Sequence, residues 1–434
     1  MKQLLAGVGR RVITPPIGNM LAGYSPARPA LSLNDDVRVT AFAFRTGEQT
    51  AMLFSCEVCN FPAEIVPEIK QVLTAATGVP GENMFLSCTH THSSAHVAWD
   101  WEEPDGYLRK IFLPNAVEAA REAIGALRPV QMGVGTTYSD VAVNRRQIKP
   151  ETGKAILGQN PWGSWDPTMT VIAFREPDGT PVANIVHYGC HNTASGKNSE
   201  ISRDWAGVMV DRLEEQSGAV TAFINGCGGD CGPRLPNGRT TGNIQLAMEL
   251  GGKAAIDAVR AYNSITYWEE APLTVRAMPI RMPLRDVGTV EDVQAQIAEL
   301  GDPEQLVGLN RGTYNQLVER AEYLKAGNIP PKWEIIDHSY IVLGDLVLQG
   351  IPFEPFSLIT LRIKAGSPFR HTLCVGYTNG SRSYFPSMDQ IIRGGYEVRM
   401  FLTRNLIPFA DDAGQGYVTN SLENMRQLYE EREF

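Results

Sequence analysis

The chain has 434 residues, of which 43% are hydrophobic and 20% are charged, and its formal net charge is −9. This balance is that of a globular protein with enough apolar residues for a large core. The negative charge disfavours nucleic acid and anionic membrane surfaces as the main partners. No uninterrupted apolar run reaches the roughly 18 residues of a membrane-spanning helix, so we expect no integral membrane association.

The N-terminus and the cysteines bear on whether the protein is secreted or cytoplasmic. Arg10 and Arg11 directly follow a short apolar run, which is not the shape of a secretory signal peptide. The seven cysteines are an odd number and stand in apolar or glycine-rich surroundings, so we expect a reducing, cytoplasmic location. Cys56 and Cys59 form a CEVC motif with no second pair to complete a zinc or redox site, which favours a structural role.

The N-terminal part of the chain is rich in predicted strands and ends in a β–α–β unit. Residues 51–56 form a continuous apolar run, as expected of a strand that is buried on both faces. The segment that follows has helical spacing and stops at Gly78. We predict strands over residues 5–12, 37–44, 51–56 and 81–92, and a helix over residues 63–76.

The rest of the chain mixes strands and helices without an internal repeat. Helices are predicted over residues 106–127, 204–216, 242–263, 290–300 and 309–326, and a further helix starts at Glu354. Strands are predicted over residues 132–143 (as a pair), 170–175, 182–188, 220–224, 275–284, 340–350 (as a hairpin) and 374–377, while residues 147–168 are typical of a loop. This pattern predicts an α/β fold of mixed β-sheets layered with helices, as a single domain over residues 1–434 with a helical insert at about residues 286–332.

Three of the seven histidines, His90, His92 and His96, stand at the end of the predicted strand over residues 81–92. Side chains at i and i+2 of an extended chain share a face, so His90 and His92 are expected to point together. Neutral imidazole is the commonest protein ligand of metal ions, which makes this pair a candidate half-site. Taken alone, the pattern fits solvated histidines at a strand end equally well.

His187 and His191 form a second cluster, at the end of the predicted strand over residues 182–188. Two strand ends that present histidine are typical of a metal site assembled from distant segments. We interpret His191 as a ligand and His187 as structural. Glu354 follows a strand directly, and a metal would supply the partner that its carboxylate needs in an apolar setting. The alternative is an acidic residue that faces a helix N-terminus.

Arg145 and Tyr384 are candidates for contact with a substrate. Arg145 stands at a strand end, where a fixed positive charge can hold a substrate carbonyl or carboxylate, and one of Arg145 and Arg146 is expected to be a plain surface charge. The phenol of Tyr384 can ligate a metal or donate to an oxyanion, although an aromatic packed at a loop explains it as well. Residues 225–233 form a glycine turn that lacks the features of a P-loop or a dinucleotide fold, so we exclude nucleotide binding.

Together these segments resemble the neutral/alkaline non-lysosomal ceramidase family, specifically its catalytic N-terminal domain. The resemblance covers nearly the whole chain in the family's order and is most specific over residues 89–93, 144–145, 191–204, 229–233, 350–354 and 379–384. It implies a zinc amidase in which His90, His191, Glu354 and Tyr384 hold the metal. His92 and Arg145 would flank the substrate carbonyl, and a metal-activated water, its pKa lowered from about 15.7 toward 7, would attack it.

The sequence departs from the family in two ways. The family carries a serine just before the proline of its glycine turn, and that place is Gly232 here, so a serine nucleophile is not available there. Asp230 of the same turn could orient water or a ligand. Family enzymes that act on ceramide carry a C-terminal immunoglobulin-like domain and are usually secreted, whereas this chain stops at Phe434 and shows no signal peptide.

We therefore expect a zinc-dependent hydrolase that cleaves a C–N amide bond in a small-molecule substrate, a small soluble amide rather than membrane ceramide. Trp99 and Trp101 suggest a pocket rim for a sugar or a small polar amide, and local packing explains them equally. The alternatives are the same metal site acting on an ester or glycosidic linkage, and a catalytically silent relative that binds a ligand. A homo-oligomer is compatible with the sequence.

Overall fold

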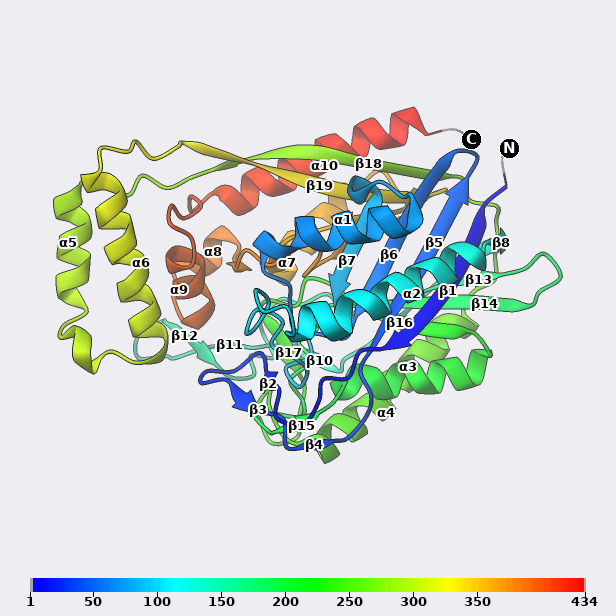
Figure 1. The fold of residues 1–434 in the computed structure, drawn as a ribbon, viewed down its shortest axis with the longest axis horizontal. Helices are drawn as coiled ribbons and strands as arrows, with labels where there is room; N and C mark the ends of the chain where they lie inside the picture. Colours follow the sequence, from blue (N-terminus) through cyan, green and yellow to red (C-terminus); the bar gives the residue numbers. More distant parts are fainter. Residues whose placement is uncertain (1–2, 433–434) are drawn as a thin grey trace.

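Three sheets form the frame of the protein, and helices lie against their outer faces (Figure 1). The computed structural model describes residues 3–432. In the first sheet β6 and β7 run parallel and the other neighbours run antiparallel. Its strand order is β7-β6-β5-β1-β8, with β1 (Leu5–Val12), β5 (Arg38–Thr46), β6 (Gln49–Cys56), β7 (Met84–Cys88) and β8 (Arg128–Pro129).

Each of the other two main sheets has one parallel pair and two antiparallel pairs of neighbouring strands. The second has the order β16-β14-β13-β9, with β9 (Gln131–Tyr138), β13 (Thr168–Arg175), β14 (Pro181–Tyr188) and β16 (Val220–Asn225). The third has the order β18-β19-β20-β22, with β18 (Leu273–Pro283), β19 (Trp333–Leu343), β20 (Leu346–Gly350) and β22 (His371–Val375). The predicted α/β fold of mixed sheets layered with helices is confirmed.

The inner faces of the three sheets meet in one shared hydrophobic core. Because side chains alternate along a strand, Leu53 of β6 lies in this core while its neighbours Met52 and Phe54 lie on the opposite face. That opposite face is covered by helices, so both faces of β6 are buried. This arrangement explains the continuous apolar run over residues 51–56.

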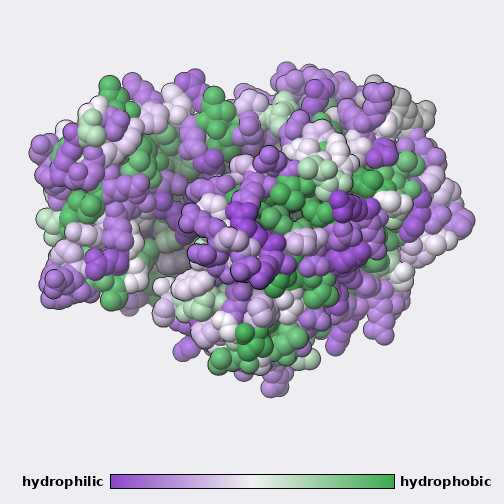
Figure 2. Space-filling view, in the orientation of Figure 1, coloured by the Kyte–Doolittle hydropathy of each residue, from purple (hydrophilic) through white to green (hydrophobic). Residues whose placement is uncertain are grey.

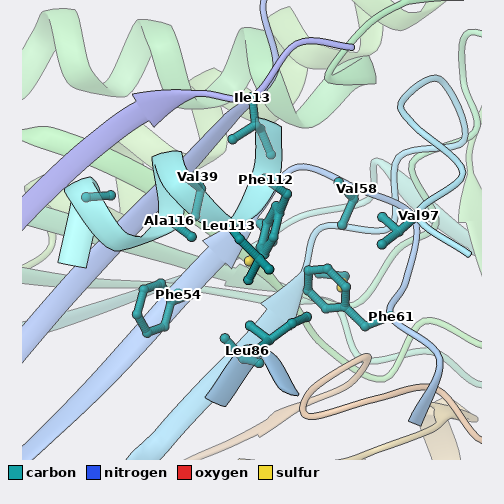
Figure 3. Packing of buried hydrophobic residues seen from close by; sticks show 14 of the residues in the cluster. Ile13, Val39, Phe54, Val58, Phe61, Leu86, Val97, Phe112, Leu113 and Ala116 are labelled. Atoms are coloured by element: carbon teal, nitrogen blue, oxygen red, sulfur yellow. The ribbon is translucent and has the colours of Figure 1, made fainter. Parts of the chain in front are cut away.

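Each outer face carries its own helices. Figure 3 shows Leu113 and Ala116 of α2 packed over the strand residues Phe54 and Leu86. The first sheet is covered by α1 (Val66–Thr77) and α2 (Leu113–Gly125), the second by α3 (Asp204–Ser217) and α4 (Ile244–Asn263), and the third by α7 (Ser357–Gly366), α9 (Tyr396–Thr403) and α10 (Ala413–Glu431). One-turn segments are η1 (Ala63–Ile65), η2 (Gly81–Asn83), η3 (Leu108–Phe112), η4 (Pro303–Gln305) and α8 (Met388–Ile391).

The polar helices predicted between residues 286 and 332 are present as α5 (Val290–Glu299) and α6 (Gly308–Lys325). They follow β18 and precede β19, and they lie at one end of the molecule (Figure 1). Val293, Leu317 and Ala321 form a small hydrophobic cluster between them. The buried Arg320 donates a 2.7 Å hydrogen bond to the carbonyl of Leu406, which fastens α6 to the segment after α9.

Short two-stranded pairs surround one end of the shared core. They are β2 (Met20–Leu21) with β3 (Arg28–Pro29), β4 (Ser32–Leu33) with β15 (Glu200–Ile201), β10 (Ala142–Asn144) with β17 (Cys231–Pro233), β11 (Arg146–Ile148) with β12 (Ala155–Leu157), and β21 (Glu354–Pro355) with β23 (Tyr384–Phe385). Glu354 and Tyr384 lie in these pairs, and Arg145 and Asp230 lie directly beside them in the chain.

Three local predictions were wrong. The strands within residues 132–143 do not pair with each other, because β9 joins the second sheet and β10 pairs with β17. Residues 147–168 are not only loop, since β11 and β12 form a hairpin there. No helix starts at Glu354: the following Pro355 disfavours a helical backbone at that residue, and α7 begins at Ser357.

The face in Figure 2 is mostly hydrophilic, with apolar side chains in separate groups. Among the helices of residues 3–432, none has both the length and the hydropathy needed to cross a bilayer.

Candidate metal centre

Each of the three sheets sends the carboxyl end of its parallel pair toward the same place. β7 leads into His90, β14 leads into His191, and β20 leads into Glu354. The fold thereby brings together residues that are far apart in the sequence, at the kind of sheet edge where α/β proteins place their ligands.

His90, His191 and Glu354 lie close enough to hold one ion. One ligand atom from each of the three residues lies within 4.8 Å of the other two. The Nε2 atoms of both histidines lie 3.4 Å from Oε2 of Glu354. All three side chains are buried, with 2%, 0% and 9% of their residue surfaces exposed. Three protein ligands of this kind leave room for a fourth ligand in a tetrahedral zinc site.

Backbone carbonyls fix the orientation of the two imidazoles. Nδ1 of His90 lies 2.8 Å from the carbonyl oxygen of Cys59, and Nδ1 of His191 lies 2.7 Å from that of Gly228. A proton on each Nδ1 leaves the Nε2 lone pairs directed at Glu354, as is usual for metal-ligating histidines. His90 also has a φ of +66°, a left-handed backbone that a non-glycine residue rarely adopts outside functional sites.

The unpaired atoms at this place match the needs of a metal ion. Nε2 of His191 and Oε2 of Glu354 are buried and accept or donate no hydrogen bond within residues 3–432. Burial without a partner costs roughly 1–3 kcal/mol for a neutral group and more for a charged one. A divalent cation bound between these atoms would satisfy both, so the residues present fit such an ion.

The protonation states of His191 and Glu354 also suit metal binding. Burial, with the nearby charges of Arg145 and His90, lowers the pKa of His191 to about 3, so its imidazole is neutral at neutral pH. Burial raises the pKa of Glu354, but the adjacent histidines outweigh it and hold that pKa well below its usual value. Burial lowers the pKa of His90, yet Cys59 and Glu354 raise it to about 10, so a cation competes with a proton for Nε2.

Tyr384 lies beside these three residues. It is the Cα partner of Glu354 in the parallel pair β21–β23, and its ring is stacked on His191 with 6.3 Å between centroids. Nη2 of Arg145 donates a 3.0 Å hydrogen bond to the phenol oxygen. The structure therefore brings together all four residues that the sequence suggested as metal ligands, and Arg145 with them.

The prediction that Arg145 or Arg146 is a plain surface charge was wrong. Only 6% and 2% of their surfaces are exposed, and both pair with Glu397, which is 1% exposed. Arg145 Nε lies 3.2 Å, and Arg146 Nη1 2.5 Å, from the two carboxylate oxygens. Two buried cations share one buried anion, because charges are rarely buried without a partner. Glu397 lies in the first turn of α9, so this pair of bonds also anchors that helix beside the cluster.

His92 and Asp230 occupy different surroundings. Nε2 of His92 lies 3.2 Å from Nε2 of His90, so His92 touches the cluster. Burial and the neighbouring histidines hold its pKa well below the usual value, so it is neutral. Both carboxylate oxygens of Asp230 are engaged by Ser357, at 2.7 Å from its amide and 2.9 Å from its hydroxyl. We interpret Asp230 as an N-terminal anchor of α7, which follows Glu354.

Sequence reasoning missed several residues around the cluster. Cys59, set aside as structural, provides the carbonyl for His90, and its Sγ lies 3.7 Å from Nδ1 of that ring. Tyr377 stacks on His90 with 4.2 Å between centroids. Tyr24 lies edge-on to His92 at 5.0 Å, in a segment with no motif to draw attention to it. The only available signal was the position of Cys59 and Tyr377 directly after apolar strands.

The other aromatic and histidine candidates lie apart from the ligand atoms. Nε2 of the buried His187 lies 3.0 Å from the carbonyl of Cys374, which agrees with a structural role. His96 packs against Trp99, whose surface is 58% exposed, while Trp101 packs on the core under α1 and α2. The structure does not place either tryptophan against the three ligand residues.

Two cavities flank the β11–β12 hairpin near this cluster. One has a volume of about 610 Å³ and a polar lining that includes Asn144, Gln147 and Arg393. The other has a volume of about 660 Å³ and a mainly apolar lining that includes Leu157 and Tyr396. The ring of Tyr396 contacts Tyr384 edge-on at 5.6 Å, so the apolar cavity lies one side chain away from the cluster.

The fold is that of a known group of enzymes. No family profile matches the chain, and no curated protein matches it. Among solved structures, the neutral ceramidase from Pseudomonas aeruginosa has a TM-score of 0.74 at 19% identity, and the match covers 100% of this chain and 76% of that one. A ceramidase complexed with C2 has a TM-score of 0.73 at 18% identity, covering 99% and 76%. The chain therefore has the neutral ceramidase fold, as the sequence resemblance implied.

Proposed function

We propose that this protein is a zinc-dependent hydrolase that cleaves a C–N amide bond, with His90, His191, Glu354 and Tyr384 as the metal ligands. The observation that carries the proposal is the convergence of two buried imidazoles and one buried carboxylate, of which His191 and Glu354 present unpaired ligand atoms. A mixed nitrogen and oxygen ligand set favours zinc over calcium or magnesium, which prefer oxygen alone. The ceramidase fold supports amide hydrolysis as the reaction.

The bound zinc would polarise the carbonyl and lower the pKa of water to about 7. The protein's own groups account for the rest of the reaction. Arg145, held by Glu397, presents a fixed positive charge beside the site, where it can stabilise the carbonyl oxygen as it gains charge. His92 is neutral and can accept a proton from the attacking water. The water oxygen joins the acyl carbon, the C–N bond breaks, and a water proton ends on the leaving nitrogen.

We propose a small soluble amide as the substrate rather than membrane ceramide. Cavities of roughly 600 Å³ are of the size that encloses a small-molecule ligand. One polar and one apolar cavity on either side of the β11–β12 hairpin favour a substrate with one polar and one apolar part. The buried, unpaired thiols of all seven cysteines favour a reducing compartment such as the cytoplasm. A homo-oligomer stays a prediction.

The test is a substrate panel of N-acyl amines, N-acyl amino acids, the matching esters and aryl glycosides, assayed with and without a chelator. The proposal predicts turnover of at least one amide, loss of that turnover after chelation, and its return with zinc. Turnover of esters or glycosides alone would replace the amide assignment with the alternative linkage. No turnover of any class by a zinc-loaded protein would leave the silent ligand-binding relative as the better description.

A further inference from the structure

The segment around Tyr24 is hydrogen-bonded to the segment that follows His92. Ala22 donates a 3.0 Å backbone hydrogen bond to Ser94, and His96 donates one of 2.7 Å to Met20. Gly23 packs so closely on His92 that a Cβ there would lie 2.2 Å from Cγ of the imidazole. The β2–β3 hairpin therefore forms one wall of the place where His92 meets the cluster.

The ring of Tyr24 is fixed in this wall. It meets the His92 ring edge-on, with 5.0 Å between centroids and 75° between planes. The guanidinium carbon of Arg28 also lies 4.9 Å from the ring centroid. Arg28 is itself immobilised, because it donates to the carbonyls of Ala22 at 3.2 Å and His92 at 2.8 Å. The ring of Tyr24 is thus held by contacts with His92 and with the immobilised Arg28.

The phenol oxygen of Tyr24 has no hydrogen-bond partner within the part of the chain that the structure describes, although it is buried. Gly23 and Ser25 on either side are exposed, so the hairpin tip faces solvent while the phenol oxygen points inward. Among the other orphaned atoms of the site, those on His191 and Glu354 are the ones that a metal would satisfy, while Nδ1 of His92, Nε of Arg145 and the phenol oxygen of Tyr377 are orphaned as well. A metal held by these ligands does not account for Tyr24.

The surroundings of Tyr24 determine whether its phenol group is protonated or ionised. Burial raises the pKa of Tyr24 above its usual value, and the charge of Asp204 adds to this shift. The positive charges of Arg28 and Arg145 act on the same group in the opposite direction, which places the phenol within reach of Arg145's field. The group is therefore a neutral hydroxyl, a hydrogen-bond donor, on the His92 side of the site.

We propose that Tyr24 is a further catalytic residue, whose hydroxyl donates a hydrogen bond to the carbonyl oxygen of the scissile amide between His92 and Arg145. The inference rests on the proposed function, because it needs an amide substrate at the cluster. An oxygen that gains negative charge during attack accepts this bond more strongly than the ground-state carbonyl does. The substrate also supplies the partner that the buried phenol otherwise lacks.

Tyr24→Phe removes the hydroxyl and keeps the ring that packs between His92 and Arg28. Removing one such donor lowers kcat by roughly 10²–10³-fold, and we expect KM to stay within about threefold. Zinc content and Tm should equal those of the wild type. Tyr138→Phe is the matched control, since Tyr138 is 62% exposed at the end of β9, and its kcat should not change. A Tyr24→Phe kcat within about threefold of wild type would overturn the proposal. A fall in kcat that is matched by a fall in zinc content or in Tm would overturn it as well.

A binding experiment separates this inference from the amide proposal. Acetohydroxamate, a small metal-binding carbonyl compound, is titrated by calorimetry into the zinc-loaded wild type and both variants. We expect Tyr24→Phe to weaken binding about tenfold, the loss of one hydrogen bond to the ligand, and Tyr138→Phe to leave it unchanged. If the wild type turns over no amide, the proposed function fails, and this titration still shows whether the Tyr24 hydroxyl donates to a bound carbonyl oxygen. Equal affinities for wild type and Tyr24→Phe would overturn the proposal.

Discussion

Glu354 and Tyr384 face each other as Cα partners in the two-residue parallel pair β21–β23. The pair is held at both ends by backbone hydrogen bonds, from Glu354 to the carbonyl of Ser383 at 2.9 Å and from Phe356 to that of Phe385 at 3.0 Å. A carboxylate and a phenol that are distant in sequence are thus fixed side by side by backbone alone.

This relationship predicts the effect of Tyr384→Phe on metal affinity. The substitution keeps the ring stacked on His191 and removes the phenol oxygen that Arg145 contacts. If that oxygen is a ligand, zinc affinity falls by at least about tenfold, the low end of what even outer-shell partners contribute. Competition titration with a chromophoric chelator measures this change. An unchanged affinity, with the same Tm, would show that Tyr384 contacts the substrate rather than the metal.

Glu397 should contribute to the stability of the protein. Glu397→Gln removes the shared counter-charge of Arg145 and Arg146, and breaking a buried ion pair costs roughly 3–5 kcal/mol of unfolding free energy. Urea unfolding measures the loss, and Glu122→Gln, which disrupts the exposed pair with Arg11, serves as the control with a change below about 1 kcal/mol. A Glu397→Gln variant as stable as the control would show that the two arginines are stabilised by other groups.

The stability of the protein should depend on pH through Glu57. Burial raises the pKa of this carboxyl from 4.5 to about 7, against the opposing charges of Arg203 and Arg38. Between these two values the folded chain holds a proton that the unfolded chain has released, so the free energy of unfolding falls as pH rises. The fall contributed by Glu57 is about 3 kcal/mol, at about 1.4 kcal/mol per pKa unit.

Glu57→Gln should remove this contribution while keeping an acceptor for the 2.6 Å hydrogen bond from the Arg38 amide. Relative to wild type, the variant should gain about 3 kcal/mol in unfolding free energy between pH 4.5 and pH 8. Urea unfolding at both pH values provides the comparison. A difference between variant and wild type that is the same at both pH values would contradict the assigned pKa.

Restoring a serine at Gly232 should not create activity. A Cβ at this position would lie 2.7 Å from Cβ of Thr240, so Gly232→Ser must displace the segment after β17. We expect a loss of roughly 1–3 kcal/mol in stability, as for other overpacked sites, and no gain in kcat. Gly125→Ser is the control, because a Cβ at Gly125 meets nothing within 4 Å. A stable Gly232→Ser enzyme with higher kcat would show that the turn can still support a serine nucleophile.

The elements that the sequence predicted well are those whose pattern reflects burial on both faces. The apolar run over residues 51–56 is of the kind expected for a buried strand, and β6 occupies that place. His90 and His191 were identified because both directly follow such strands, and a strand end is a fixed position in the fold. The identity of Glu354 was also predicted, but its local structure was not, because the effect of Pro355 on the preceding residue was overlooked.

The rest depended on contacts that leave no local pattern. Arg146 could not be recognised as buried, because its partner Glu397 belongs to a helix far along the chain. Cys59 was judged by its thiol, whereas its backbone carbonyl orients His90, and any residue type provides a carbonyl. Tyr24 lies in an irregular segment whose importance comes only from its packing against His92.

The proposed function requires His90, His191 and Glu354 to bind one zinc ion together, and the metal content of the purified protein reports this binding. Protein purified from zinc-containing medium is dialysed, and its metal is measured by inductively coupled plasma mass spectrometry alongside His191→Ala and the control His371→Ala, which lies at the far end of β22. We predict about one zinc per chain in the wild type and in His371→Ala, and almost none in His191→Ala. A wild-type protein that binds no metal, or a His191→Ala variant that keeps its zinc, would contradict the proposed function.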